Sequence, residues 1–249
     1  MFRVAIASYK RSDTIKDKTL HYLIDQCSVS PEMIDVFVQE DQVSDYKESL
    51  AELRVNVLLG APGMKGQRNA IDMHYEKGQK VLCFDDDVEG LYKRENEKKV
   101  TLFKNLKGLA AIGFNECAKN RTALFGVSPL SNPFYMNNKI TNNLKFICGP
   151  FYGQIMQKDP SLLTTVEYKT DFERSLKYFY KFGSVVRLNM FGPKTAYYKE
   201  KGGLQGIRTK EIENKSAATL IARYPNNVRV NKNRKDDGRV QIILHGKRC

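Results

Sequence analysis

The chain has 249 residues, 41% of them hydrophobic and 10% aromatic, which is enough to bury a sizeable core in one large domain or two small ones. This composition excludes a disordered chain, and no apolar run approaches the roughly 20 residues of a membrane span. The formal net charge of +13 favours an anionic partner over a neutral one.

The first 90 residues alternate between two patterns. Short apolar runs that end in polar residues or glycine are typical of buried strands, and apolar spacings of three and four are typical of helices. Such alternation predicts an α/β fold, with a mostly parallel sheet and crossover helices. The expected strands are residues 3–12, 34–41, 55–63 and 79–87, and the expected helices are residues 19–27, 45–54 and 66–78.

The second half has a less regular order of patterns. Its mixture of helices and strands, without a clean linker, favours one domain with a nucleotide-binding half (1–90) and an acceptor half (91–249). A Gly- and Lys-rich loop is expected at 199–210. The expected helices are 102–119, 171–183 and 211–225, and the expected strands are 123–130, 145–158, 185–193 and parts of 228–249.

Three aspartates follow the apolar run of residues 81–84. In an extended segment Asp85 and Asp87 would point to one face, at the sheet edge where α/β proteins bind ligands. Carboxylate pairs of this kind suit Mg²⁺ or Mn²⁺, which often share their site with substrate phosphates. The alternative is an acidic turn or a helix cap without bound metal.

Three segments carry a resemblance to a known family. "VAIASYKRS" near the start, "GMKGQRN" at 63–69 and "FDDD" at 84–87 resemble the nucleotide-sugar transferases of the GT-A fold. In particular the chain resembles the TET/JBP-associated glycosyltransferases of phages and kinetoplastids, which attach sugar to hydroxymethylated pyrimidines in DNA, as in base J. The resemblance implies a GT-A-like (Rossmann-like), mostly parallel sheet flanked by helices, with a mixed α/β acceptor half.

The resemblance also implies where a nucleotide-sugar donor would bind. The physical character of the second segment, residues 63–69, agrees, because Lys65 and Arg68 can counter phosphate charge and Gly63 and Gly66 permit close backbone approach. The alternative for this segment is an ordinary loop that leads into a helix. The implied donor residues are Ser8, Tyr9, Gln39, Glu40, Lys65, Arg68, Asn69 and Asp85, and the implied metal ligands are Asp85 and Asp87.

GT-A sites often add a late histidine to the metal ligands. His245 follows an apolar run near the carboxyl terminus and resembles that ligand, whereas His21 and His74 lie inside expected helices. The alternative for His245 is an exposed residue of the tail.

An inverting transferase needs a carboxylate that deprotonates the acceptor hydroxyl. In the family a late acidic motif opens a helix, and "TDFERSLKYF" resembles it, with Asp171 in the matching position and Glu173 as the second candidate. Carboxylates at helix starts are also common as caps. A retaining reaction would not need this base.

The positive charge is concentrated in the second half. Residues 1–90 hold 11 Lys and Arg against 16 Asp and Glu, a net of −5, whereas residues 91–249 hold 30 against 12, a net of +18. Basic side chains supply most sequence-independent DNA affinity, although an inert basic surface is the alternative. Aromatics in 149–153 and 178–182 either stack on a base or belong to the core. The candidate DNA-binding residues are Arg223, Arg229, Lys232, Arg234, Lys235 and Arg239.

These features together predict a metal-dependent glycosyltransferase of phage origin. It would move a sugar from a nucleotide-sugar, expected to be a UDP-sugar, to a 5-hydroxymethylpyrimidine in DNA, with Mn²⁺ or Mg²⁺. The alternatives are a glycan or protein acceptor, a nucleotidyltransferase of related fold, and a DNA-binding module with a degenerate site. Five isolated cysteines and an early polar turn instead of a signal peptide predict a reducing cytoplasm, and the resemblance implies that of a phage-infected host.

Overall fold

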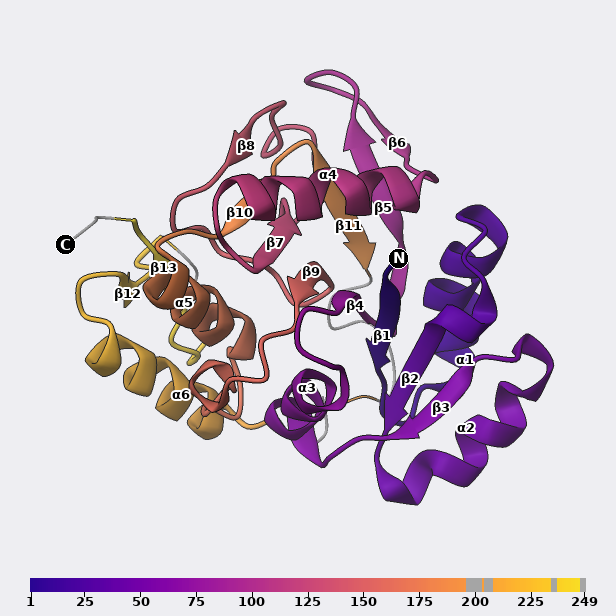
Figure 1. The fold of residues 1–249 in the computed structure, drawn as a ribbon. Coiled ribbons are helices and arrows are strands. Elements are labelled where there is room, and N and C mark those ends of the chain that lie inside the picture. The colour runs from indigo at the N-terminus through magenta and orange to yellow at the C-terminus, as the bar shows by residue number, and fades with distance from the viewer. Residues whose placement is uncertain (196–202, 204–207, 234–236, 247–249) are drawn as a thin grey trace.

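The computed structural model describes residues 1–195, 203, 208–233 and 237–246. An eight-stranded sheet forms its centre, in the order β3-β2-β1-β4-β9-β7-β10-β8 (Figure 1). The strands are β1 (Arg3–Ala7), β2 (Ile34–Val38), β3 (Asn56–Leu59), β4 (Lys80–Asp85), β7 (Leu124–Val127), β8 (Ile140–Thr141), β9 (Phe151–Ile155) and β10 (Val186–Leu188).

The sheet is mostly parallel, as the alternation predicted. Strands β3, β2, β1 and β4 pair in parallel. Strand β9 pairs antiparallel with both β4 and β7, so β7 runs in the direction of β4, and β10 is parallel to β7. The carboxyl ends of β1 to β4, β7 and β10 therefore share one edge, where ligands bind in open α/β sheets.

Both faces of the sheet are covered. Val4 and Ile6 of β1 belong to the core on one face, and Ala5 belongs to the core on the other. This burial on two sides explains why the strands are continuous apolar runs. The first face carries α1 (Ser12–Ile15), the π-helical turns η1 (Lys16–Leu20) and η2 (Tyr22–Gln26), α2 (Val43–Ser49) and α4 (Leu106–Lys119), and the second carries α3 (Gly63–His74) and α5 (Thr170–Phe182).

A second, three-stranded sheet follows the acidic triplet. It consists of β11 (Phe191–Thr195), β5 (Val88–Arg94) and β6 (Val100–Leu102), all antiparallel. The triplet therefore leads into a strand, so its interpretation as a helix cap is wrong. The single strand expected at 185–193 is also wrong. It divides at the buried Asn189, whose Nδ2 donates to Lys139 O at 2.8 Å, and its two parts join different sheets.

The carboxyl-terminal part packs against α5. Helix α6 (Lys210–Arg223) and the hairpin of β12 (Val228–Val230) and β13 (Ile242–Leu244) share a core that includes Leu176, Leu220 and Ile242. Gly183, at φ +74°, ends α5 as predicted. Among the described helices, none is long and apolar enough to cross a membrane. Four short 3₁₀ turns complete the elements: η3 (Pro31–Met33), η4 (Glu40–Gln42), η5 (Ala51–Leu53) and η6 (Pro160–Leu162).

Candidate active site at the carboxyl edge of the sheet

The three aspartates form the turn between β4 and β5. Asp85 is the last residue of β4, and Asp86 and Asp87 make the turn itself, so the triplet is not the extended segment that the spacing argument assumed. The carboxylate of Asp86 is buried and accepts hydrogen bonds from Ser8 Oγ at 2.7 Å and from Arg11 Nη1 at 2.9 Å. Asp86 thus joins the acidic turn to the turn that follows β1.

The negative charge of the Asp87 carboxylate is only partly balanced by nearby positive charge. Its side chain is only 14% exposed, and Arg11 Nη1 lies 3.7 Å from its Oδ2. Burial, and after it the negative charges of Asp85 and Asp86, raises the pKa of Asp87 to about 7. A divalent cation at this turn would relieve the accumulated negative charge.

Asp85 forms an ion pair with Arg68 of α3. The Asp85 side chain is 31% exposed, so its carboxylate is open to solvent as well as to Arg68. Thr19 fixes the backbone here, since its Oγ1 donates to Asp85 O at 2.8 Å and accepts from Val88 N at 2.9 Å. The guanidinium of Arg68 is buried, and its Nη1 has no hydrogen-bond partner within the described residues. Arg68 therefore retains a donor at the acidic turn.

Gly149 marks the point where the acidic turn meets the start of α5. A Cβ at Gly149 would lie 3.6 Å from Asp85 Oδ2, 3.7 Å from Arg68 Nη2 and 3.9 Å from Asp171 Oδ2. Asp171 is thus brought beside Asp85 by the tertiary structure. Burial raises the pKa of Asp171, against the opposing positive charge of Arg174. A raised pKa makes a carboxylate a better proton acceptor near neutral pH.

Arg174 supplies a second buried guanidinium near this point. It is 2% exposed, and its guanidinium lies over the ring of Tyr152, 3.5 Å from the centroid. Its Nε and Nη2 have no hydrogen-bond partner among the residues that the structure describes. Unpaired buried donors are rare in folded proteins and are a common sign of an absent ligand or water.

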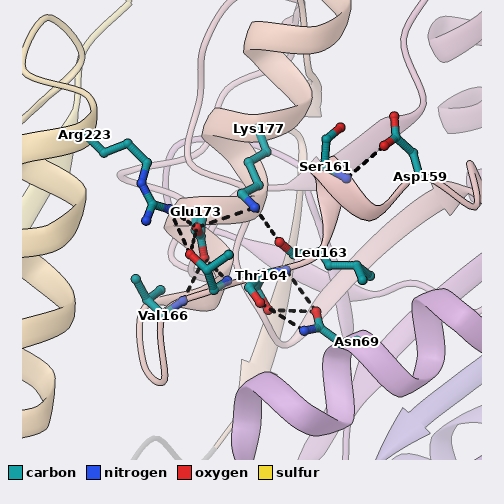
Figure 2. Close-up of polar contacts among 10 residues, drawn as sticks. Asn69, Asp159, Ser161, Leu163, Thr164, Val166, Glu173, Lys177 and Arg223 are labelled. Carbon is teal, nitrogen blue, oxygen red and sulfur yellow. Dashed lines mark hydrogen bonds and ion pairs between the residues drawn. The ribbon is translucent and has the colours of Figure 1, made fainter.

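Glu173, the second predicted base, is anchored away from the acidic turn (Figure 2). Its fully buried carboxylate accepts from Thr165 N at 2.6 Å, Val166 N at 3.0 Å and Arg223 Nη1 at 2.7 Å. Lys177 Nζ lies 3.7 Å from the same group. These bonds connect α5 to the preceding loop and to α6. The Glu173 carboxylate therefore has a structural role.

The anchoring of Glu173 predicts a large effect on stability. Glu173→Ala would leave Arg223 and two backbone N–H groups without their partner, and we expect the free energy of unfolding to fall by about 3–5 kcal/mol. Glu167→Gln, which removes only the surface ion pair with Lys65, should change it by less than about 1 kcal/mol. Urea denaturation of the two variants measures the difference, and equal effects would refute the anchoring role.

The other predicted residues of α3 have different partners. The Asn69 amide pairs with the backbone of Thr164, donating to its O and accepting from its N, both at 2.9 Å (Figure 2). Lys65 pairs with Glu167 at the surface. Of the three α3 side chains that the resemblance assigns to the donor, Arg68 alone contacts the acidic turn.

The residues predicted beside the nucleobase follow β1 and β2. Ser8 is buried, and its Oγ also bonds the hydroxyl of Tyr46 at 2.6 Å. Tyr9 is half-buried at the same turn. Gln39 is half-buried and Glu40 is exposed directly after β2. Strands β1 and β2 are adjacent and parallel, so these two turns are neighbours at the edge that carries the aspartates.

His245 does not complete a metal site with the aspartates. It follows β13, where its backbone N donates to Asn227 O at 3.0 Å. Across the described residues, no three His, Cys, Asp or Glu side chains gather as a metal shell. The structure does not bring His245 together with Asp85 and Asp87: β13 pairs with β12 in a separate sheet of the described residues.

Two of the predicted DNA-binding residues form ion pairs within the protein. Arg223 pairs with the buried Glu173, and Arg239 pairs with Asp237 at 3.0 Å. Their guanidinium groups are thus partly neutralised before any polyanion binds.

The remaining predicted DNA-binding residues divide into two groups. Arg229 and Lys232 are exposed on β12 and just after it, where a phosphate could reach them. Arg234 and Lys235 lie outside the described residues.

Four residues of the candidate site were not predicted from the sequence. Arg11 could have been noticed as a positive charge just beyond the first strand, at the edge where the acidic strand ends. Gly149 could have been noticed as half of a Gly-Pro turn between two apolar runs. Thr19 and Arg174 carry no such signal, because they resemble ordinary helix residues.

No known protein-family profile and no curated protein sequence matches the chain. Solved structures do resemble it, at low identity. TarS from S. aureus has 15% identity and a TM-score of 0.52 over 88% of this chain, which spans 65% of the TarS chain. Glucosyl-3-phosphoglycerate synthase from Mycobacterium tuberculosis, in complex with phosphoglyceric acid, has 12% identity and a TM-score of 0.55, with 90% of this chain and 79% of that chain covered.

The mannosyltransferase PcManGT from Pyrobaculum calidifontis, in complex with GDP-Man and Mn²⁺, has 13% identity and a TM-score of 0.54, with 89% of this chain and 64% of that chain covered. At these identities the likeness concerns the fold. The predicted GT-A-like fold, with a mostly parallel sheet flanked by helices, is confirmed.

Proposed function

We propose that the chain is a metal-dependent glycosyltransferase with a nucleotide-sugar donor. The observation that carries the proposal is the cluster of Asp85, Asp87, Arg68 and Asp171 at the carboxyl edge of a GT-A-like sheet. It combines carboxylates for a cation, a guanidinium for a diphosphate and a carboxylate for an acceptor hydroxyl. The PcManGT complex with GDP-Man and Mn²⁺ supports the same pairing of donor and metal on this fold.

The residues present fit a divalent cation. Burial, and after it the negative charge of Asp85 and Asp86, raises the pKa of Asp87, and the Asp85 carboxylate is open to solvent on one side. Two carboxylates suffice for Mg²⁺ or Mn²⁺ when phosphate oxygens and water complete the ligands. When bound, the cation would neutralise charge on the leaving diphosphate. Arg68, freed from part of its ion pair with Asp85, would donate to the diphosphate.

Asp171 is the proposed general base. As the acceptor oxygen forms its bond to the anomeric carbon, the bond from that carbon to the diphosphate breaks, and the hydroxyl proton passes to the Asp171 carboxylate. Burial raises the pKa of that carboxylate, and the positive charge of the neighbouring Arg174 opposes this effect. Ser8, Tyr9, Gln39 and Glu40 are proposed to contact the nucleobase and ribose.

The proposed acceptor is a 5-hydroxymethylpyrimidine in DNA. Three observations support it: the resemblance to the base J type enzymes, the net charge of +18 in residues 91–249, and the exposed Arg229 and Lys232. A phage-infected cytoplasm is the proposed setting.

One experiment tests donor and acceptor together. The protein is incubated with Mn²⁺, a panel of UDP- and GDP-sugars, and DNA that is either hydroxymethylated or unmodified, and the nucleosides are analysed by mass spectrometry. We expect a hexose or pentose adduct on hydroxymethylated DNA alone. Hydrolysis of a nucleotide-sugar without any DNA adduct would support the enzyme class and reject the DNA acceptor.

DNA affinity is expected to depend on exposed basic residues and on salt. The double substitution of Arg229 and Lys232 by Gln removes two phosphate contacts, so binding to all sequences should weaken alike and the slope of log K against log salt should fall by about 2. The same double change at Lys47 and Lys77, which are exposed in the acidic half, is the control. Fluorescence anisotropy at several salt concentrations measures both, and equal slopes for the two variants would reject this contact surface.

A second candidate acceptor is a small anionic molecule. The buried, unpaired N–H groups of Arg68 and Arg174 favour it, as does the likeness to the synthase solved with phosphoglyceric acid. Phosphoglyceric acid should then raise the melting temperature of the wild type and leave that of Arg174→Met unchanged. No shift in either protein would remove this candidate.

A further inference from the structure

An exposed pair of aromatic residues stands on the loop between β7 and β8. Phe134 is 79% exposed and Tyr135 is 65% exposed, and their rings meet edge to face with centroids 5.0 Å apart. By contrast Phe151 and Tyr152, in the segment where stacking aromatics were considered from the sequence, are buried in the core. Large exposed apolar side chains that adjoin one another mark an interaction site more often than isolated ones do.

The turn that presents this pair is well bonded. Asn132 accepts from Phe134 N at its side-chain Oδ1 and from Tyr135 N at its backbone O, both at 3.0 Å. Arg94 Nε donates to Pro133 O at 3.1 Å, and this bond ties the turn to β5. The next residue, Met136, is buried. The two rings are therefore held outward on a fixed base, which reduces the entropy that a ligand would lose on contact with them.

The loop starts at the edge of the sheet that carries the candidate active site. Strands β4 and β7 run in the same direction with only β9 between them, so their carboxyl ends are about 10 Å apart. Asp85 ends β4 and Ser128 follows β7. Ser128 N donates to Phe191 O at 2.8 Å, and Asn137 N donates to Asn189 O at 3.2 Å. The loop therefore starts at this edge, and its aromatic turn lies beside Arg94 at the far end of β5, in the acceptor half of the chain.

The charge around the loop suits a polyanion. Residues 117–158 contain no Asp or Glu and five Lys and Arg, two of which, Lys139 and Lys145, lie within or just after the loop. Nucleic acid combines negative phosphates with flat bases, and aromatic side chains beside basic residues bind single strands in this way. A protein or neutral glycan would have less use for an acid-free loop beside two lysines.

We propose that Phe134 and Tyr135 form a stacking platform for unpaired bases of the acceptor DNA, beyond the nucleotide that receives the sugar. This inference rests on the proposed DNA acceptor and names residues that bind it. An enzyme that modifies a base must withdraw it from the stack, and an aromatic platform would compensate for the stacking that is lost.

The chain contains no tryptophan, which allows a direct test. Phe134→Trp would place the single tryptophan of the chain on the platform, where it can be excited apart from the tyrosines, and Ile112→Trp, at an exposed position of α4, is the matched control. We expect single-stranded DNA of about 12 nucleotides to quench the emission of Phe134→Trp saturably and to leave Ile112→Trp unchanged. Unchanged emission of Phe134→Trp at saturating DNA would overturn the proposal, as would quenching by a neutral oligosaccharide in place of DNA.

Dissociation constants of variants without an added tryptophan complete the test. Phe134→Ala and Tyr135→Ala should each bind single-stranded DNA about 5- to 100-fold more weakly, with an unchanged salt slope. Phe134→Leu, which keeps apolar area but loses the ring, should be as weak as Phe134→Ala, and Phe134→Tyr should match the wild type. Wild-type affinity in Phe134→Leu would overturn the platform while the proposed function stands. Absence of DNA binding by the wild type would overturn both, and nucleotide-sugar hydrolysis reports separately on the transferase chemistry.

Discussion

Replacing Asp87 with asparagine is expected to abolish sugar transfer while leaving the protein folded. Asparagine keeps the size of the side chain but removes a negative charge that a Mn²⁺ or Mg²⁺ ion would bind. We expect turnover to fall by roughly 10²–10⁴-fold, which corresponds to about 3–5 kcal/mol of transition-state stabilisation. Initial rates of transfer to hydroxymethylated DNA, at saturating Mn²⁺, measure this loss.

The same substitution should stabilise the folded protein above neutral pH. The pKa of Asp87 is about 7 in the folded protein against an ordinary value of 3.8, so the folded state holds an extra proton between these pH values. The free energy of unfolding of the wild type therefore falls as the pH rises through this window. Asp87→Asn cannot ionise, and at about pH 8 it should be more stable than the wild type by roughly 1–4 kcal/mol.

Two comparisons separate a metal role from a structural one. Mn²⁺ should raise the melting temperature of the wild type at about pH 8 and not that of Asp87→Asn, because the ion competes with the proton for the same carboxylate. Asp45→Asn, an exposed change on α2, should alter neither activity nor stability. Full activity of Asp87→Asn, or of the wild type in excess EDTA, would show that the turn does not bind a catalytic cation.

Replacing Asp171 with asparagine is expected to retain donor binding and to lose turnover. The variant keeps the shape of the side chain beside Gly149 but cannot accept the proton of the acceptor hydroxyl. A general base contributes about 10²–10⁴-fold to the rate, and we expect a loss of that size with an unchanged dissociation constant for the nucleotide-sugar. Titration calorimetry and single-turnover rates measure the two quantities separately.

The control for Asp171 is its neighbour on the same helix. Glu173→Ala should lose stability but keep its activity per folded molecule at low temperature, because Glu173 is bonded to Thr165, Val166 and Arg223. The anomeric configuration of the product decides the mechanism. A product that retains the configuration of the donor would remove Asp171 from the role of base and leave it as a helix cap or an acceptor-binding residue.

Local pattern predicted the elements and the general place of the site. Apolar runs that end in polar residues located β1, β2 and β4, since a strand buried on both faces must be apolar along its length. The crossover helices between them made the strands parallel, and parallel strands gather their carboxyl ends. The turns after β1 and β2 and the acidic triplet therefore had to share one edge of the sheet.

In the second half of the chain, the bounds and the pairing directions of individual strands were harder to predict. The run at 185–193 reads as one strand, yet Asn189 divides it between two sheets by bonding Lys139 and turning the chain. Strand β9 pairs antiparallel with two neighbours, which the apolar pattern of 145–158 does not reveal. Pairing partners lie far away in sequence, and an apolar run is compatible with either direction.

By itself the sequence determined the GT-A-like order of elements and the acidic turn, because both follow from residues near one another in the chain. The tertiary structure alone decided which charges meet there. It brought Arg11 to Asp86, Arg68 to Asp85 and Asp171 to Gly149. The same packing turned Glu173 toward α6, because a buried carboxylate is stable only where donors converge on it, and the donors come from segments that local pattern cannot align.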